Sequence, residues 1–328
     1  MMYADGFGSA ATVLQRFLPD AAEDVALSIQ MLMALAYVLI NTGRKRDSTQ
    51  RIDEAVRRAE ALGPPTLLSR ALGLQVVLRF MCGAGIDEAS LQRALALEDD
   101  RSPAQLAFQP RLQNAILRAW TGDLDVARTE LRSIHRQRIE NGEESESVFI
   151  SYHRAMVEIW SGDLAEAHRI AEEAMHRAAH LDGDVRLFSV VAILSSLAAY
   201  AGRVDEARHD ARIALDASDR SEGRELAGWM VTNLGFLETS LGNYAEALAV
   251  LQPVVDGLIA DPDYTEIIVA SGIGDAVESL VQLDRLDEAE QLTHLMERNG
   301  MRLDRAWMRS VAGRCRSMLL AARGDIAR

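Results

Sequence analysis

The chain has 328 residues, of which 48% are hydrophobic, 5% are aromatic and 7 are proline, and its formal net charge is −14. This length suffices for two globular domains or one long repeat domain, and the near absence of proline and of strand-like runs excludes a β-rich fold. The negative charge repels phosphate backbones, so this chain by itself is a poor candidate for nucleic-acid binding.

No export or membrane signal is visible in the sequence. The N-terminus lacks a basic region followed by an apolar core, and the most hydrophobic segment, 29–40, is too short to span a bilayer. Cys82 and Cys315 lie far apart in apolar helical segments, which favours free thiols over a disulfide. Together these features predict a cytoplasmic protein that does not contact a membrane.

A short corner pattern recurs along the whole chain, and its clearest copy is the stretch 240–247, Ser-Leu-Gly-Asn-Tyr-Ala-Glu-Ala. Its Gly permits a left-handed helix end, Asn243 is a candidate cap for the next helix, and the small Ala allows two helices to approach closely. Aligned on the Gly and on the Ala five residues later, the copies are Gly6/Ala11, Gln50/Ala55, Ala84/Ala89, Gly122/Ala127, Gly162/Ala167, Gly202/Ala207, Gly242/Ala247, Asp284/Ala289 and Gly324.

The spacing of these corners predicts the fold. It is 40 residues three times from Gly122 to Gly242, then 42 and 40, while the N-terminal intervals are 44, 34 and 38. Such a period indicates stacked helix pairs. We therefore expect residues 1–328 to form one all-α domain, a right-handed superhelical solenoid of about seven to eight antiparallel helix pairs with a partial repeat at each end.

Within one interval the two amphipathic helices are expected at 164–180 and 185–200, joined by the polar connection 181–184. Ser102 and Pro103 have the residue types of a helix start. Pro110 and Pro253 each fall inside a helical pattern, so each should bend or break a helix. The basic segment 43–50 has the character of an exposed, mobile insertion at a corner.

Two resemblances follow from these residues. Asn233-Leu234-Gly235, Gly242, Tyr244 and Ala247, with Leu251 and Val254 beyond, resemble the tetratricopeptide (TPR) pattern, although the period of 40 exceeds the usual length of about 34 residues. The stretches 303–307 and 313–325 are similar to the repeat region of the large ATP-dependent LuxR-family transcriptional regulators of bacteria, the class of the maltose-responsive activator.

The second resemblance implies a sensor or partner-binding region that binds an inducer or a regulatory protein. In that family a nucleotide-binding domain precedes the repeats and a DNA-binding helix-turn-helix domain follows them. The chain has neither a G-x-x-x-x-G-K-[ST] loop nor a segment after Gly324 for a DNA-reading domain, and both ends interrupt a repeat. We expect a fragment of a longer regulator; the alternative is a stand-alone TPR scaffold for protein–protein interaction, and the cut ends of either could stack as a homo-oligomer.

In a TPR-like solenoid the first helix of each pair lines a concave groove, at positions 13, 10, 6 and 3 residues before the corner Gly. The expected binding residues for a peptide, a protein partner or a small-molecule inducer are Phe149, Tyr152, Met156, Trp229, Thr232, Phe236 and Arg314, the last as a partner for carboxylate or phosphate. The same rule selects Ile159, Ser189, Ala192, Ser196, Ala199, Thr239, Ser271, Gly274, Glu278, Val281, Val311, Met318 and Ala321. Because these helices also pack on their neighbours, each aromatic has the alternative role of a core residue.

Other patterns favour structural roles. Trp120, Trp160 and Tyr200 all stand two residues before a corner Gly, which predicts that they pack the ends of their helices. His176 and His180 with Glu172 have a metal-like spacing, but charged helices produce such pairs by chance. The acidic pairs 205–206 and 287–288 suit helix N-termini, and no phosphate loop surrounds the glycines of 272–274. We therefore predict no catalytic residue, metal or cofactor.

Overall fold

The computed structural model describes residues 6–99, 105–142, 144–178 and 183–325, and every regular element in these ranges is helical. The candidate helix start at Ser102 and Pro103, together with His180, lies outside them. The N-terminal half contains α1 (Phe7–Phe17), α2 (Val25–Asn41), α3 (Lys45–Leu62), α4 (Pro65–Met81), α5 (Glu88–Ala96), α6 (Pro110–Thr121), α7 (Leu124–Glu140) and α8 (Glu144–Ser161), with short 3-10 turns at Pro19–Ala21 and Leu106–Phe108. The C-terminal half contains α9 (Leu164–Ala178), α10 (Asp184–Tyr200), α11 (Val204–Ser221), α12 (Arg224–Ser240), α13 (Tyr244–Ala260), α14 (Ile267–Ala270), α15 (Ile273–Gln282), α16 (Leu286–Arg302) and α17 (Ala306–Ala322).

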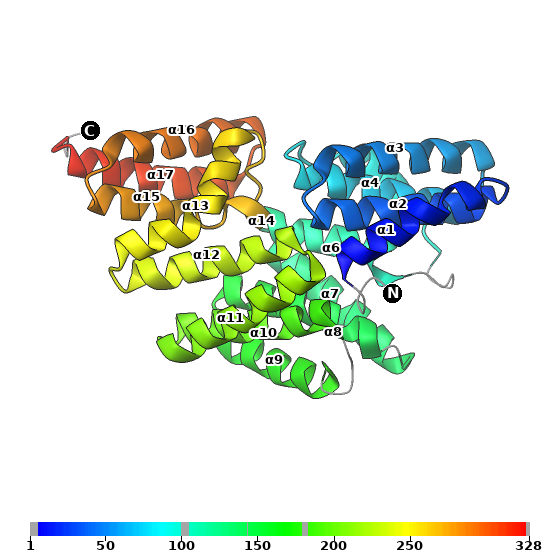
Figure 1. The fold of residues 1–328 in the computed structure, drawn as a ribbon, viewed down its shortest axis with the longest axis horizontal. Helices are drawn as coiled ribbons and strands as arrows, with labels where there is room; N and C mark the ends of the chain where they lie inside the picture. Colours follow the sequence, from blue (N-terminus) through cyan, green and yellow to red (C-terminus); the bar gives the residue numbers. More distant parts are fainter. Residues whose placement is uncertain (1–5, 100–104, 143, 179–182, 326–328) are drawn as a thin grey trace.

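Successive helices pack as antiparallel neighbours, which confirms the expected solenoid of helix pairs (Figure 1). The pairs are α2/α3, α4/α5, α6/α7, α8/α9, α10/α11, α12/α13 and α15/α16, and α17 follows the last of them. The Ala five residues after the corner Gly is fully buried in the units from Ala127 to Ala289, because the two helices of a pair meet there. The hydrophobic core thus runs from pair to pair along the solenoid.

The corner residues adopt the left-handed backbone that the sequence predicts at most positions. Gly242 has φ 77°, and Asp284 has φ 59° in place of a glycine. The second corner was misplaced in the sequence analysis: the chain turns at Gly43, with φ 78°, and not at Gln50. Segment 43–50 is therefore not an insertion, since α3 starts at Lys45 and Ser48 is fully buried, with its hydroxyl donating to the Ala36 carbonyl at 2.7 Å.

Two further local predictions need correction. Pro110 does not interrupt a helix but begins α6 at a position where no backbone donor is needed, whereas Pro253 lies inside the assigned span of α13. Asn243 precedes α13 without capping it, and its side-chain amide N–H instead donates to Glu238 Oε2 at 2.8 Å. Asp163 does cap α9, accepting from the Glu166 backbone N–H at 3.0 Å.

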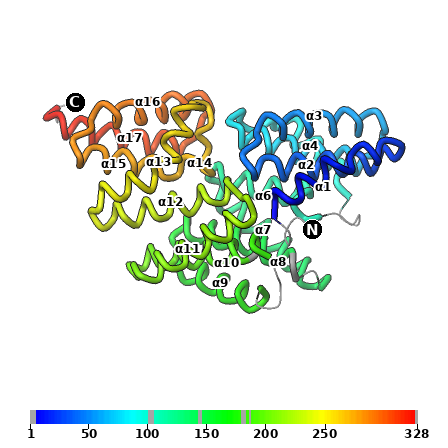
Figure 2. The backbone as a smooth tube through the Cα atoms, in the orientation of Figure 1, coloured from blue at the N-terminus to red at the C-terminus, as the bar shows by residue number. Residues whose placement is uncertain are grey.

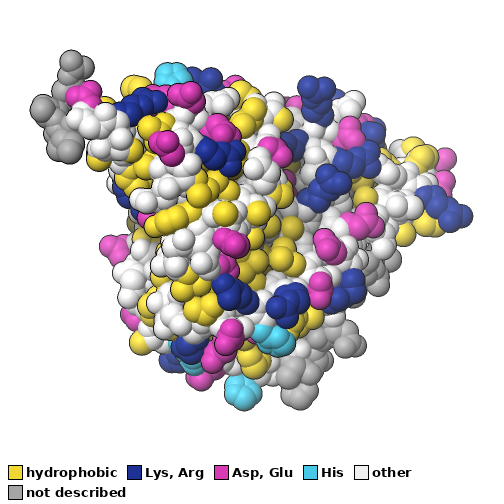
Figure 3. All heavy atoms as spheres, turned by 60° about the vertical axis from the view of Figure 1, so that its left-hand side comes forward, with side chains coloured by type: hydrophobic (Ala, Val, Ile, Leu, Met, Phe, Trp, Pro, Cys, Tyr) yellow, Lys and Arg dark blue, Asp and Glu magenta, His cyan; other side chains and the backbone are white. Residues whose placement is uncertain are grey.

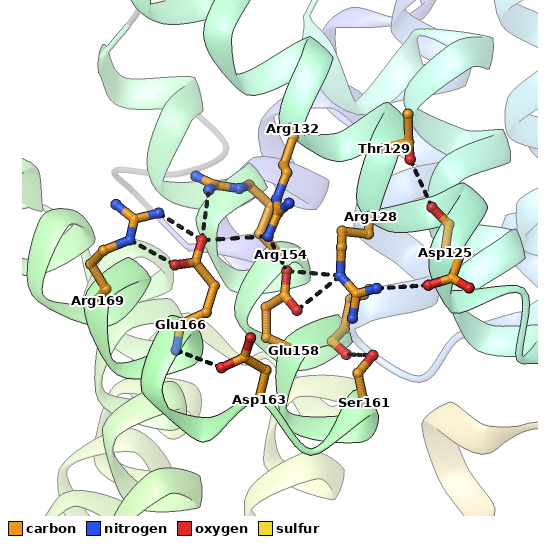
Figure 4. Close-up of polar contacts among 11 residues, drawn as sticks. Asp125, Arg128, Thr129, Arg132, Arg154, Glu158, Ser161, Asp163, Glu166 and Arg169 are labelled. Atoms are coloured by element: carbon orange, nitrogen blue, oxygen red, sulfur yellow. Dashed lines mark hydrogen bonds and ion pairs between the residues drawn. The ribbon is translucent and has the colours of Figure 1, made fainter.

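Ion pairs join adjacent repeats at equivalent positions. Arg128 of α7 donates to Glu158 of α8 at 2.9 Å, and 80 residues further on Arg208 of α11 donates to Glu238 of α12 at 2.8 Å. Figure 4 shows the contact between Arg128 and Glu158 near Glu166. The guanidinium of Arg169 donates to the Glu166 carboxylate at 2.7 Å. The Glu158 carboxylate is almost fully buried, so its arginine contacts are needed to offset desolvation.

The solenoid bends until its first and last thirds touch. Figure 2 shows the N-terminal helices and the C-terminal helices side by side above α7–α11. Arg302 donates from Nη1 to the Gly83 carbonyl at 3.1 Å, and Lys45 Nζ lies 2.9 Å from the ring centroid of Tyr264. Tyr264 in turn donates to Glu225 at 2.9 Å. These contacts fix the curvature and enclose the interior of the superhelix.

Both cysteines are free, with Cys315 buried and Cys82 half-buried, in agreement with the sequence analysis. Among the described helices, none combines the length and the apolar character needed to cross a membrane.

Candidate functional site

The first helices of successive pairs line one open cavity of about 110 Å³, here called the groove cavity. Its walls come from α8, α10 and α12, and its floor comes from the junction of α14 and α15. Of the positions selected by the groove rule, the cavity brings together Tyr152, Met156, Ile159, Ala192, Ser196, Trp229, Thr232, Phe236 and Ser271. The spacing rule therefore located side chains that share a cavity, and their role in binding remains a proposal.

Aromatic rings form two walls of the groove cavity. Trp229 stacks with Trp160, with centroids 6.1 Å apart and planes at 30°, and meets Tyr152 edge to face at 6.5 Å. A second ring pair is formed by Tyr200 and Phe236, whose centroids lie 4.8 Å apart with their planes at 35°. Such ring pairs stabilise one another beyond the area they bury, which holds the walls in place.

A helix break supplies the polar side of the groove cavity. The helix pattern of this repeat stops at Ala270 and resumes at Ile273. At the break, a Cβ on Gly272 would lie 2.9 Å from Leu251 Cδ2 and 3.0 Å from Thr232 Cγ2, so only glycine permits this close approach. The break places Ser271 against Thr232, with their hydroxyl oxygens 3.4 Å apart, and directs Asp275 to the cavity.

Asp275 carries the charge of the groove cavity. Burial raises the pKa of its carboxyl group to about 6, while Arg314 opposes this rise and Glu278 adds to it. Within the described ranges its carboxylate has no hydrogen bond and no ion pair. At neutral pH this carboxylate is therefore mostly ionised, and among the described residues it has neither a hydrogen bond nor an ion pair.

Two predicted binding residues lie elsewhere. Phe149 contacts His153, with centroids 4.9 Å apart, and lines a second cavity behind the groove. Arg314 does not line the groove cavity; its Nη1 is 3.4 Å from Glu278 Oε2, so it already has a carboxylate partner.

The sequence analysis missed five lining residues, namely Trp160, Tyr200, Met230, Asn233 and Asp275. The expected structural role holds for Trp120, which is 8% exposed and stacks on Phe80 at 5.8 Å. Tyr200 packs against Phe236 but is 49% exposed, so its ring is also accessible from the cavity. The sequence did contain a signal for Trp160 and Tyr200. Each stands two residues before a corner Gly, and therefore four residues after the groove position that lies six residues before that Gly. Residues four apart share one helix face, so the spacing alone indicates that both side chains reach the groove.

The second cavity, here called the central cavity, lies inside the bend of the solenoid and also measures about 110 Å³. Its lining is largely apolar and includes Trp120, Phe188 and Ile268, and it shares Tyr152 and Trp229 with the groove cavity. Ile268 is part of the lining because α14 packs against α6. Burial lowers the pKa of His153 here to about 3, so this side chain is neutral at physiological pH.

Figure 3 shows one face of the molecule, on which hydrophobic side chains gather in a band across the middle and charged side chains lie around it. In the described part of the chain no group of three or more His, Cys, Asp or Glu side chains is placed to hold a metal ion. His176, considered above with Glu172, is exposed on α9, and Glu172 instead lies 3.5 Å from His168.

Comparisons with known proteins add little to these observations. No family model matches the sequence, and no curated protein matches it. Among solved structures, the chain is matched to the TPR domain of P58(IPK) with 13% identity, over 90% of this chain and 99% of that one, with a TM-score of 0.22. At this TM-score the likeness does not bear on the fold, and the solenoid of helix pairs is shown by the helices and corners described above.

Proposed function

We propose that this chain is a non-enzymatic helical repeat domain that binds a peptide segment of a partner protein in the groove. The observation that supports the proposal is the convergence of five aromatic side chains from α8, α10 and α12 on one open cavity. Aromatic residues are only 5% of the chain, and partly exposed aromatic clusters are typical of interaction sites. A volume of about 110 Å³ suits one inserted side chain, since whole small-molecule sites measure roughly 300–1,000 Å³.

A second candidate function follows from the resemblance of 303–307 and 313–325 to LuxR-family regulators. In that case the same cavity would bind a small-molecule inducer and bias an attached switch domain. The inducer would have to bind one curvature of the solenoid more tightly than another, since equal affinity shifts no equilibrium. No family model or curated match adds to this resemblance, and the small cavity favours the peptide.

Selection from a displayed random-peptide library tests the proposed function. The wild-type chain is compared with the double variant Tyr200→Ala, Phe236→Ala and with Met301→Ala, which removes a side chain that is 71% exposed outside the groove cavity. We expect peptides that bind the wild type and Met301→Ala and lose at least about tenfold affinity for the double variant. Absence of enriched peptides, or enrichment that the double variant retains, would contradict the proposal.

A further inference from the structure

We infer that the group bound in the groove cavity is an alkylammonium cation, held between the faces of aromatic rings and beside the carboxylate of Asp275. This inference rests on the proposed binding function of the same cavity and specifies its ligand chemistry. The shared chemistry is an ammonium head group, carried either by a lysine-type side chain of a peptide or by a free small organic cation.

The aromatic walls have the composition that attracts a cation. A ring face carries partial negative charge, and tryptophan gives the strongest cation–π attraction, followed by tyrosine and phenylalanine. Trp160, Trp229 and Tyr152 form one group of contacting rings in the cavity lining, and Tyr200 with Phe236 form a second group. A head group in the cavity would lie beside rings of both groups.

The protein's own cations do not use these rings. In the described ranges the cation–π contacts are Arg16 with Phe17, Lys45 with Tyr264 and Arg305 with Phe80. None of these three rings lines the groove cavity. Among the described residues, no cation of the protein therefore occupies the rings of the groove cavity.

Asp275 supplies the matching formal charge. The nearest acidic neighbour, Glu278, already has Arg314 at 3.4 Å, whereas Asp275 has no ion-pair partner among the described residues. A bound ammonium group would offset the cost of desolvating this carboxylate. A carboxylate or phosphate ligand would instead meet an unpaired negative charge, so the cavity disfavours acidic ligands.

The size and charge of the molecule agree with this ligand. A cavity of about 110 Å³ is somewhat smaller than a cavity of roughly 150 Å³ that holds one benzene-sized molecule, which limits the inserted group to a compact head group. The net charge of −14 attracts cations toward the surface and raises their rate of association.

Calorimetric titration with choline and with its neutral isostere 3,3-dimethylbutan-1-ol tests the inference. The two probes have nearly the same shape and differ in charge. We expect choline to bind at least about tenfold more tightly than the isostere, because only choline gains cation–π and ion-pair contacts. Equal affinity for the two, or binding of neither, would overturn the inference.

Matched variants locate the site. Asp275→Asn and Phe236→Leu should each weaken choline binding by about tenfold, since the first removes the charge and the second keeps apolar bulk but removes a ring face. Glu246→Gln, which neutralises an exposed carboxylate on α13 outside the cavity lining, should leave the affinity within about twofold. An unchanged affinity in Asp275→Asn, with the fold verified by circular dichroism, would also overturn the inference.

Peptides selected for binding to the groove show whether a peptide or a small molecule carries the cation. They also test the ammonium ligand separately from the proposed function. A peptide with a central lysine or trimethyllysine should bind at least about tenfold more tightly than the same peptide with norleucine, which lacks the charge, at that position. Tighter binding of the charged peptide than of choline assigns the cation to a peptide, and the reverse assigns it to a small molecule. Peptides that bind the groove with no preference for a charged side chain would contradict the ammonium ligand while leaving the proposed function intact.

Discussion

The groove cavity and the central cavity have the same volume, about 110 Å³, and share Tyr152 and Trp229, yet their chemistry differs. The groove cavity contains a carboxylate on Asp275 with no hydrogen-bond or ion-pair partner among the described residues. In the central cavity the Glu225 carboxylate accepts a hydrogen bond from Tyr264 at 2.9 Å, and His153 is neutral because burial lowers its pKa to about 3. The comparison teaches that aromatic content alone does not identify a binding site in a repeat protein. Exposure and an unpaired charge separate the rings available to a ligand from those that pack the interior.

The largest expected effect is a difference in the free energy of unfolding between variants in the two cavities. Trp120→Ala removes a nearly buried indole that stacks on Phe80, so the free energy of unfolding should fall by about 3–5 kcal/mol in chemical denaturation. Tyr200→Ala, in the groove wall, should cost about 1 kcal/mol because this ring is half exposed. Equal losses in the two variants would remove the distinction between a structural and a binding wall.

The close approach of Gly83 to Asp263 closes the bend around the central cavity. Substitutions at Gly83 and at Gly162, which has a similar backbone conformation, test this contact. Gly83 and Gly162 have φ 80° and 83°, so each change to Ala brings a left-handed penalty of about 1–2 kcal/mol. A Cβ on Gly83 would lie 2.1 Å from the Asp263 carbonyl oxygen, whereas at Gly162 it would meet no atom within 4 Å. Gly83→Ala should therefore lower the unfolding free energy by about 1–3 kcal/mol more than Gly162→Ala. Equal costs would show that the closing contact is dispensable.

The charge of the groove cavity predicts a pH dependence. Burial raises the pKa of Asp275 to about 6, above the value of about 3.9 expected in the unfolded chain, so between these values the folded state holds the extra proton. Its contribution to stability is present at low pH and is lost as pH rises through about 6. The charged or titratable groups that face it are Glu278 on its own helix, Arg314 and Cys315 on α17 and Tyr200 on α10.

Asp275→Asn should therefore raise the free energy of unfolding at pH 8, flatten its dependence on pH between about 4 and 6, and weaken choline binding by about tenfold. Denaturant unfolding at pH 5 and pH 8 measures the two stability effects, and Glu246→Gln, an exposed site outside the cavity, serves as the control. A residue needed only for the fold would behave oppositely, with the variant less stable at pH 8.

The smallest expected effect concerns one hydroxyl. Tyr200→Phe keeps the ring that pairs with Phe236, so choline affinity should change by less than about twofold in titration. Tyr200→Leu, which removes the ring, should weaken binding several-fold. A loss of binding in Tyr200→Phe equal to that in Tyr200→Leu would assign the effect to the hydroxyl and contradict the role of the ring face.

The sequence predicted the helix pairs well because the corner pattern is local and repeats. It also located groove residues such as Met156 and Thr232, since their spacing from the corner follows from helix geometry. The error at Gly43 arose because Ser48 replaces the alanine that marks the other corners. Asp275 could not be found, because its place in the cavity depends on the break at Gly272 and on packing between distant helices.

The central claim is that the groove cavity, and not the central cavity, binds a cation, and the four tryptophan indole N–H signals in NMR spectra test it most directly. Trp160 lines only the groove cavity, Trp120 lines only the central cavity, Trp229 lines both and Trp307 lines neither. On addition of choline we predict that the signals of Trp160 and Trp229 shift together while those of Trp120 and Trp307 stay. Shifts of Trp120 and Trp229 without Trp160, or no shift at all, would contradict the claim.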